Sequence, residues 1–283
     1  MAFARKFITV TVQLENGQFS GGGKSAKIQN HRVAVAIEQP GSPDMGKATV
    51  SIFGLPLDMM NRLTKLPYTQ EAVGQNYITI EAGEEGGQSG IAFKGTIFAA
   101  FADIVQPVAA LRIDALAGLY SAVASAEPTS RKGQTDVANL MGDLAKQAQL
   151  TLENNDVNCK VSNPYLPSSP RQQIKALADA AGINWVIEKD TLAIWPKDGS
   201  RKGGAVKVGP KTGLVGYPRY TASGIEITTV FNPQFIYGGS IEVESQLTPA
   251  CGTWYIVNVA HEIECEAPGG RWFTILSCTR TKV

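Results

Sequence analysis

Two histidines and four cysteines carry most of the potential for covalent chemistry in this chain of 283 residues. If Gly269 and Gly270 close a two-residue hairpin, residues whose numbers sum to 539 face each other, and His261 lies opposite Cys278. A thiol beside an imidazole can be an activated nucleophile. No orienting Asp or Asn is evident, however, and a histidine inside a strand is more often a hydrogen-bonded core residue. We therefore expect no catalytic residue, and we expect free, mostly buried thiols at Cys159, Cys251, Cys265 and Cys278.

Two glycine-rich segments imitate catalytic motifs without completing them. The segment from Gly17 to Ser25 resembles a phosphate-binding loop, but five residues separate Gly17 from Gly23 where the motif needs four, and no helix is expected to follow. The segment from Gly83 to Gly90 fails as a nucleophile elbow because Ile91 occupies the final glycine position. Both segments are interpreted as turns between strands.

Carboxylates and metal-binding residues give no site either. Glu242 and Glu244 share one strand face, as do Glu262 and Glu264, but neither pair lies in an apolar frame that would raise a pKa. Alternating glutamates more often mark a solvent face or protect a strand edge. Because the spacings His-x-x-x-His and Cys-x-x-Cys are also absent, we expect no metal and no cofactor.

The four tryptophans are more informative than the acids. Trp185 and Trp195 lie in one predicted hairpin, and Trp254 and Trp272 lie in the last two predicted strands. Exposed aromatic rings can bind sugars, but large rings more commonly anchor hairpin cores or subunit contacts.

Composition indicates a globular protein without a dedicated nucleic-acid surface. The hydrophobic content is 43%, the charged content is 18% and the formal net charge is +1, whereas nucleic-acid binders are usually much more basic. The one basic cluster, at Arg201, Lys202, Lys207 and Lys211, is interpreted as a solvated linker, with contact to an acidic partner surface as the alternative. Neither a cleavable signal nor a membrane span is indicated, so we expect the protein to be made and kept in a cytoplasm.

The residues from 1 to 120 read as a strand-rich domain. Period-two alternation predicts strands over 7–14, Val33–Ile37, Ala48–Phe53, Tyr77–Glu81, Ile91–Ala99 and Val108–Ala115. A short helix bracketed by prolines is predicted between Pro56 and Pro67. Antiparallel strands with glycine-rich turns and one helix suggest a small barrel or sandwich.

The residues from 121 to 200 have a mixed texture. A connector over Ser121–Gly133 precedes a helix with Thr135 as its N-cap and then two short strands, Leu150–Glu153 and Val157–Val161. A second helix is predicted from Ser169, with Gln172 completing a capping box and Gly182 ending it, followed by a hairpin over Asn184–Trp195. The pattern suggests two helix-plus-hairpin units.

The residues from 201 to 283 form a second strand-rich domain, with runs such as Gly224–Val230 and Gly252–Ile263 and almost no candidate chemistry. The predicted fold class is therefore α+β, mainly β, with two tube-like antiparallel β-barrels and a mixed insert between them.

With these residues in view, the chain resembles the baseplate hub proteins of contractile-tailed bacteriophages over most of its length. The resemblance rests on the order and spacing of several segments: Ala48–Pro56 before the Met-Met-Asn-Arg-Leu-Thr helix, Phe93–Phe98, Ser169–Ile174, Thr191–Pro196, Thr212–Pro218, Phe231–Pro233 and Pro268–Trp272.

The resemblance implies a structural virion protein that is not an enzyme. It implies a homotrimer in which three chains present six barrels to a six-fold tail tube, with the tail tube protein, the central spike protein and other baseplate (wedge) proteins as partners. DNA would only pass through the lumen, and the particle would assemble in the host cytoplasm. Trp254, Trp272 and Tyr217 are the candidate interface residues. Two alternatives stay open: the equivalent ring of a tailocin or type VI secretion spike, and a carbohydrate-binding module or hydrolase of the tail tip.

Overall fold

The first third of the chain is a set of antiparallel strands with one short helix. In this computed structural model the structure describes residues 4–14, 23–64, 76–105 and 108–282. Its elements here are β1 (Lys6–Gln13), β2 (Ser25–Ile28), β3 (Val33–Gln39), β4 (Lys47–Phe53), α1 (Leu57–Leu63), β5 (Tyr77–Glu84), β6 (Ser89–Val105) and β7 (Val108–Leu116). All six predicted strands are present, and β2 is an additional strand that pairs with β1. The predicted turn at Gly83–Gly90 joins β5 to β6, whereas most of Gly17–Ser25 lies outside the described residues.

The middle third holds two longer helices on a small sheet. Its elements are α2 (Leu119–Val123), β8 (Thr129–Ser130), β9 (Gln134–Asp136), α3 (Val137–Gln147), β10 (Thr151–Asn154), β11 (Lys160–Ser162), β12 (Tyr165–Leu166), α4 (Pro170–Ala181), β13 (Ile183–Glu188) and β14 (Thr191–Pro196). The hairpin of β13 and β14 is confirmed. The second predicted helix-plus-hairpin unit therefore forms from α4, β13 and β14, but the first does not, because β10 pairs in parallel with β14 and β11 pairs with β9.

Helix ends in this part differ from the prediction in three places. Asp136, not Thr135, caps α3, because its side chain accepts a hydrogen bond from the Asn139 amide at 2.9 Å. Ser169 precedes α4 but makes no side-chain capping bond, so the predicted capping box does not form. The α2 turn also occupies the start of the expected connector. Gly182 ends α4 in the left-handed conformation, as predicted, with φ of 64°.

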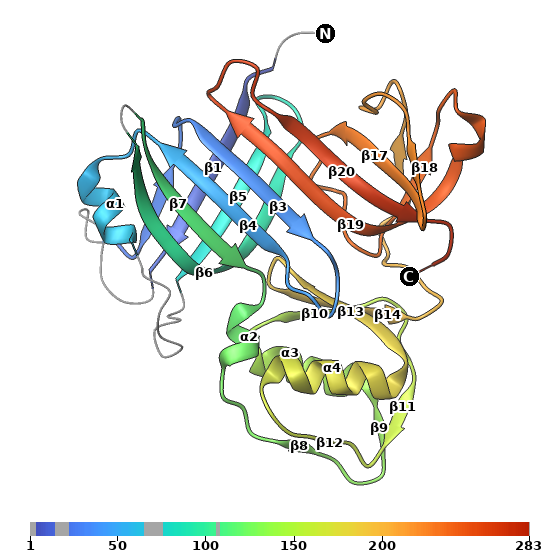
Figure 1. Cartoon of the computed structure of the whole chain (residues 1–283). Coiled ribbons are helices and arrows are strands. Elements are labelled where there is room, and N and C mark those ends of the chain that lie inside the picture. The colour runs from blue at the N-terminus through green and yellow to red at the C-terminus, as the bar shows by residue number, and fades with distance from the viewer. Residues whose placement is uncertain (1–3, 15–22, 65–75, 106–107, 283) are drawn as a thin grey trace.

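The last third returns to strands and shares a sheet with the first third. Its elements are β15 (Val206–Val208), β16 (Arg219–Thr221), β17 (Gly224–Val230), β18 (Ser240–Val243), a short 3-10 turn η2 (Thr248–Ala250), β19 (Gly252–Cys265) and β20 (Trp272–Thr279). Within β19, residues Val259–Cys265 pair with Gln39–Val33 of β3. The strand-rich parts therefore form one sheet in the order β16-β17-β20-β19-β3-β4-β7-β6-β5-β1-β2, which Figure 1 shows as a curved surface from β6 on the left to β17 on the right. No closed barrel forms within the described residues.

The two strand-rich parts repeat one pairing scheme. In the first part the order is β3-β4-β7-β6-β5-β1, and in the last part it is β16-β17-β20-β19-β18-β15. The long strand of each part carries a β-bulge opposite its hairpin partner, between Ile97 and Ala99 in β6 and between Ile256 and Asn258 in β19. When the two bulges are aligned, each antiparallel strand pair of the first part has the same register as its counterpart in the last part. The outermost pair differs in direction, because β15 runs parallel to β18 whereas β1 runs antiparallel to β5. The chain thus contains the same sheet unit twice.

Burial follows this arrangement. One hydrophobic cluster fills the first sheet unit, another lies between the helices and the small sheet of the middle third, and a further cluster fills the last sheet unit. The cluster of the first unit also takes in Phe231, Ile263, Cys265 and Trp272 from the last third. The two sheet units are therefore joined by shared packing as well as by hydrogen bonds. No helix within the described residues has the length and apolar character that crossing a membrane would require.

Candidate functional site: a buried ion-pair junction and two sheet ends

The predicted pairing of His261 with Cys278 is wrong. In the sheet, His261 lies opposite Thr274, and Cys278 lies opposite Ile256. The turn between β19 and β20 is longer than two residues. The Glu264 amide donates to the Arg271 carbonyl at 2.7 Å, so the last pair of facing residues lies several residues before Gly269 on the β19 side. Each strand is therefore shifted relative to the guessed register.

The environment of these two residues excludes a thiolate–imidazolium pair. The His261 Nδ1 atom lies 2.9 Å from the Thr274 hydroxyl, and Phe231 stacks edge-on against the ring at 5.1 Å. Complete burial lowers the pKa of His261 to about 3, helped by the charge of Lys189. Burial raises the pKa of Cys278 to about 12. Both groups are neutral at physiological pH and serve the core.

Of the alternating glutamates, Glu262 and Glu264 form surface ion pairs, as expected for a solvent face, and Glu242 accepts a hydrogen bond from the Thr253 hydroxyl at 3.1 Å. Glu262 accepts from Arg271 at 2.8 Å, and Glu264 accepts from Arg32 at 2.8 Å. In the part of the chain that the structure describes, no group of three or more His, Cys, Asp or Glu side chains could hold a metal ion. A cavity of about 340 Å³ between the first sheet unit and the middle third has hydroxyl and amide walls, with the ion pair of Lys94 and Asp190 on one side.

The three candidate interface residues occupy different environments. Trp254 is buried, and its Nε1 atom donates to the Ala250 carbonyl at 2.8 Å. Trp272 is buried and lies edge-on to Phe231 at 5.3 Å. Tyr217, in contrast, is 65% exposed beside the edge of β16. An interface role for these residues stays a prediction, and within one chain the two tryptophans contribute to the core.

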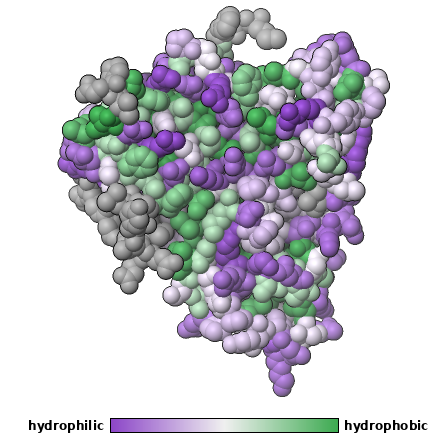
Figure 2. Space-filling model, viewed as in Figure 1, coloured by the Kyte–Doolittle hydropathy of each residue, from purple (hydrophilic) through white to green (hydrophobic). Residues whose placement is uncertain are grey.

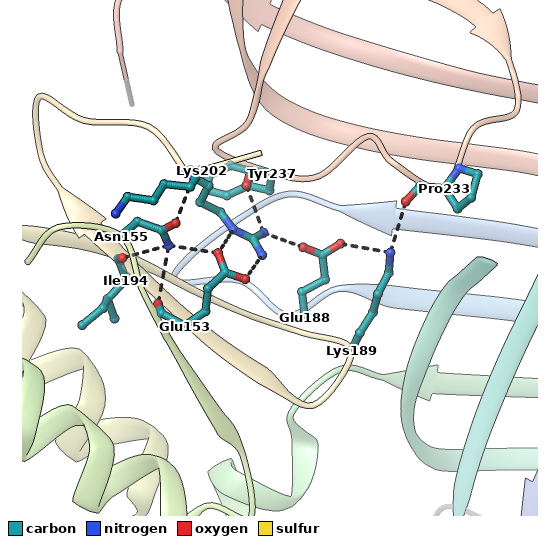
Figure 3. Close-up of polar contacts among 9 residues, drawn as sticks. Glu153, Asn155, Glu188, Lys189, Ile194, Lys202, Pro233 and Tyr237 are labelled. Atoms are coloured by element: carbon teal, nitrogen blue, oxygen red, sulfur yellow. Dashed lines mark hydrogen bonds and ion pairs between the residues drawn. The ribbon is translucent and has the colours of Figure 1, made fainter. Parts of the chain in front are cut away.

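The most elaborate polar cluster centres on Arg201, where the middle third meets the last third. Its guanidinium donates to both carboxylate oxygens of Glu153, at 3.0 and 2.9 Å, and to Glu188 at 2.8 Å. It also donates to the Tyr237 carbonyl at 3.3 Å. Figure 3 shows the two carboxylates reaching from β10 and β13 toward this one cation. A bidentate, charge-assisted contact of this kind fixes geometry as well as charge.

The cluster extends to both sides of the arginine. Asn155 donates to Glu153 at 2.9 Å and accepts from the Lys202 amide at 2.9 Å. On the far side, Lys189 at the turn of the β13–β14 hairpin lies 3.9 Å from Glu188 and donates to the Pro233 carbonyl at 3.4 Å (Figure 3). The next turn residue, Asp190, pairs with Lys94 of β6. The hairpin turn is therefore bonded to both sheet units.

Charge pairing favours the ionised forms of Arg201 and Glu153 despite the burial of the cluster. Burial alone would lower the pKa of Arg201, but the hydrogen bonds and charges of Glu153 and Glu188 raise it overall. Burial would likewise raise the pKa of Glu153, but the contacts from Arg201 lower it overall. The interpretation of the basic cluster as a solvated linker is wrong for Arg201, which is buried. Lys202, Lys207 and Lys211 are exposed as expected, with Lys202 in an exposed pair with Asp156 at 2.7 Å. The acidic surface that Arg201 meets belongs to the same chain.

No pattern in the sequence predicts this junction or the exposed ends of the sheet. The available signal for the junction was Glu188, a lone acid at the end of the otherwise apolar strand from Trp185. The front sheet is the stretch β16-β17-β20-β19-β3-β4-β7-β6 of the large sheet. Large side chains are exposed at both of its ends, among them Phe101, Ile104 and Val108 of β6 and β7 and Tyr217 and Tyr220 by β16. These ends can contact another molecule.

Comparison with known proteins points to phage tails. A family model described as baseplate hub gp41 matches residues 7–268. No curated protein matches the chain. Among solved structures, a tail protein from Neisseria meningitidis MC58 is similar with a TM-score of 0.64 at 11% identity, covering 96% of each chain. The 43 kDa tail protein of prophage MuSo2 from Shewanella oneidensis has a TM-score of 0.62 at 11% identity, covering 98% of this chain and 97% of that one.

A third similar structure comes from a secretion machine. The E. coli c3393 protein, described as a component of the type VI secretion system with structural similarity to the T4 bacteriophage tail proteins gp27 and gp5, has a TM-score of 0.60 at 8% identity. The match covers 95% of this chain and 76% of that one. At such identities these structures establish a shared fold.

Proposed function

Because this chain belongs to the baseplate hub gp41 family, and is thus a structural baseplate protein, we propose that it forms a homotrimeric hub that joins the six-fold tail tube to the three-fold central spike of a contractile tail. The observation that carries the proposal is the repeated sheet unit. Each chain holds two such units in register, joined side by side through β19 and β3. Three copies would therefore present six similar units, which is the match a six-fold tube requires.

In this proposal the chain divides into a first tube-like domain (1–120), an insert (121–200) and a second tube-like domain (201–283). The self-contained hydrophobic cluster of the middle third supports an insert that packs on its own. The Arg201 junction would then fix the insert against the ring, where it can face neighbouring baseplate parts. The two tube-like domains become barrel-like only when neighbouring units surround the lumen, since each is an open sheet in the single chain.

The partners proposed are the tail tube protein, the central spike protein and the wedge proteins of the baseplate, with DNA only in transit through the lumen. The hub would assemble in the host cytoplasm and remain in the virion tail. Light scattering coupled to size-exclusion chromatography, together with native mass spectrometry of tail fragments, tests the proposal. A mass of three chains is expected; a monomer both in concentrated solution and in tail fragments would contradict it.

A second candidate is the equivalent ring of a tailocin or a type VI secretion spike. The similarity to the E. coli type VI secretion component favours keeping this candidate. The genes beside the coding sequence distinguish the two, since capsid and packaging genes accompany a phage tail and are missing from the other machines.

A further inference from the structure

The repeated sheet unit has one strand position that is filled in the last third and that no described strand fills in the first third. In the last third, the half of β19 beyond its bulge pairs with β20 on one side and with β3 on the other. In the first third, the corresponding half of β6, Ala99–Val105, pairs with β7 on one side, and within the described residues no strand pairs with its other side. The strand that corresponds to β3 is β16, which pairs with β17 and with no other described strand.

We infer that the free edge of β16 in one copy of the chain lies against the free half of β6 in the next copy, in the place that β3 takes against β19 within the chain. The inference rests on the proposed ring and adds the surface that closes it. Figure 1 shows β6 and β17, the partner of β16, at opposite ends of the front sheet. A contact between unlike ends of successive copies is the head-to-tail kind that generates a ring.

Side-chain exposure supports the inference when equivalent positions are compared. On β19, Ile263 is 2% exposed under β3, whereas its counterpart on β6, Ile104, is 53% exposed. On β3, Ile37 is 1% exposed beside β19, whereas its counterpart on β16, Tyr220, is 52% exposed. In each pair, the buried residue lies where the two sheet units of the chain meet, and the exposed residue lies where no second unit covers it.

Figure 2 shows hydrophobic side chains at the left edge of the molecule, over α1 and the adjacent end of the β6–β7 hairpin. Large exposed apolar groups of this kind mark interaction sites.

The register within the chain predicts the register between chains. Transferring the pairs Ala260–Glu38, His261–Ile37 and Glu262–Ala36 onto β6 and β16 places three new pairs opposite each other: Phe101 with Thr221, Ala102 with Tyr220, and Asp103 with Arg219. The last of these brings opposite charges together. Arg219 is exposed and at present pairs with Glu226 of its own sheet at 2.8 Å, so it can bridge both acids.

The inferred contact is short in hydrogen bonds and depends on side chains. Pro218 precedes β16 and has no backbone N–H, which limits the pairing to the few residues after it. Such a proline also discourages pairing with unrelated strands. We therefore expect the Tyr220 ring, covering the apolar end of β6, to supply most of the affinity, and the Asp103–Arg219 pair to select the register.

Charge reversal in the full-length chain tests the contact. Arg219→Asp should raise the protein concentration at half-assembly by about tenfold or more, because it places two acids opposite each other. The double variant Arg219→Asp/Asp103→Arg should recover assembly. Arg131→Asp is the matched control, since Arg131 is an exposed arginine of the middle third paired with Asp143, and it should leave assembly unchanged. Analytical ultracentrifugation measures the assembly of the wild-type chain and of these three variants.

Cysteine pairs test the register independently. The variant Phe101→Cys/Thr221→Cys should cross-link between copies on mild oxidation, because directly opposed strand residues lie within the Cα separation that a disulfide spans. Phe101→Cys/Arg219→Cys, shifted along the strand, should cross-link much less, and the wild-type chain sets the background from its own cysteines. A trimer that is indifferent to charge reversal and forms no such cross-link would overturn this inference while leaving the hub proposal standing. A wild-type chain that is monomeric in solution and in the tail would overturn both.

Discussion

Removing the central cation of the junction is the sharpest test of how the middle third is held. Arg201→Met keeps an unbranched apolar side chain in the site but leaves Glu188, whose side chain is only 5% exposed, with the longer 3.9 Å contact to Lys189 in place of a direct hydrogen bond from a cation. Breaking one partner out of a buried ion pair costs about 3–5 kcal/mol. Glu153 adds less, because its side chain is 37% exposed and water can reach it. We expect the junction to lose about 3–5 kcal/mol, set mainly by Glu188.

The assay is urea unfolding followed by tryptophan fluorescence, with hydrogen exchange of the segments around Trp195 and Tyr237, whose rings lie 5.9 Å apart across the junction. Lys202→Met is the matched control, since Lys202 forms an exposed pair with Asp156, and exposed pairs contribute at most about 1 kcal/mol. Combining Arg201→Met with neutral replacements of both acids should restore much of the loss, because replacing a whole buried ion cluster is often close to neutral. If Arg201→Met were no more destabilising than Lys202→Met, the reasoning would be refuted.

Three further predictions concern burial and close packing. Since burial lowers the pKa of His261 to about 3, its stabilising contribution is complete above pH 6.5 and is lost as the pH falls toward 3, by about 1.4 kcal/mol per pH unit; His261→Gln should flatten this slope in unfolding measurements. Cys278 should resist thiol reagents in the native chain and react after unfolding, as mass spectrometry can show; rapid native labelling would contradict its burial. Gly238→Ala should destabilise more than Gly133→Ala in thermal unfolding, because both glycines have positive φ but only at Gly238 would a Cβ meet the Trp195 ring, at 2.7 Å; equal losses would show that backbone strain alone matters.

The local elements of the fold could be read from the sequence because each carries its own pattern. Alternation predicts β1, β3 and β7 within a residue or two, and the turn residues Lys189 and Asp190, both at positive φ, mark the β13–β14 hairpin. The β2 strand was missed because four residues are too few for alternation to be recognised.

Long-range features could not be predicted in the same way. The pairing of β19 with β3 joins segments far apart in the chain, and nothing in either strand names its partner. The position opposite His261 depended on the length of the β19–β20 turn, in which Glu266 and Gly269 both take positive φ, so a guess based on two glycines gave the wrong neighbour. Arg201 looked like a linker residue because its partners come from β10 and β13.

The resemblance to baseplate hubs was confirmed by the family match, while the copy number and the contacts of the ring depend on assembly.

Strand-resolving imaging of the assembled baseplate tests the central claim most directly. We expect three copies around the axis, six sheet units surrounding one lumen, and β16 of each copy beside β6 of the next. A ring with another number of copies, or a hub position filled by a different protein, would contradict it.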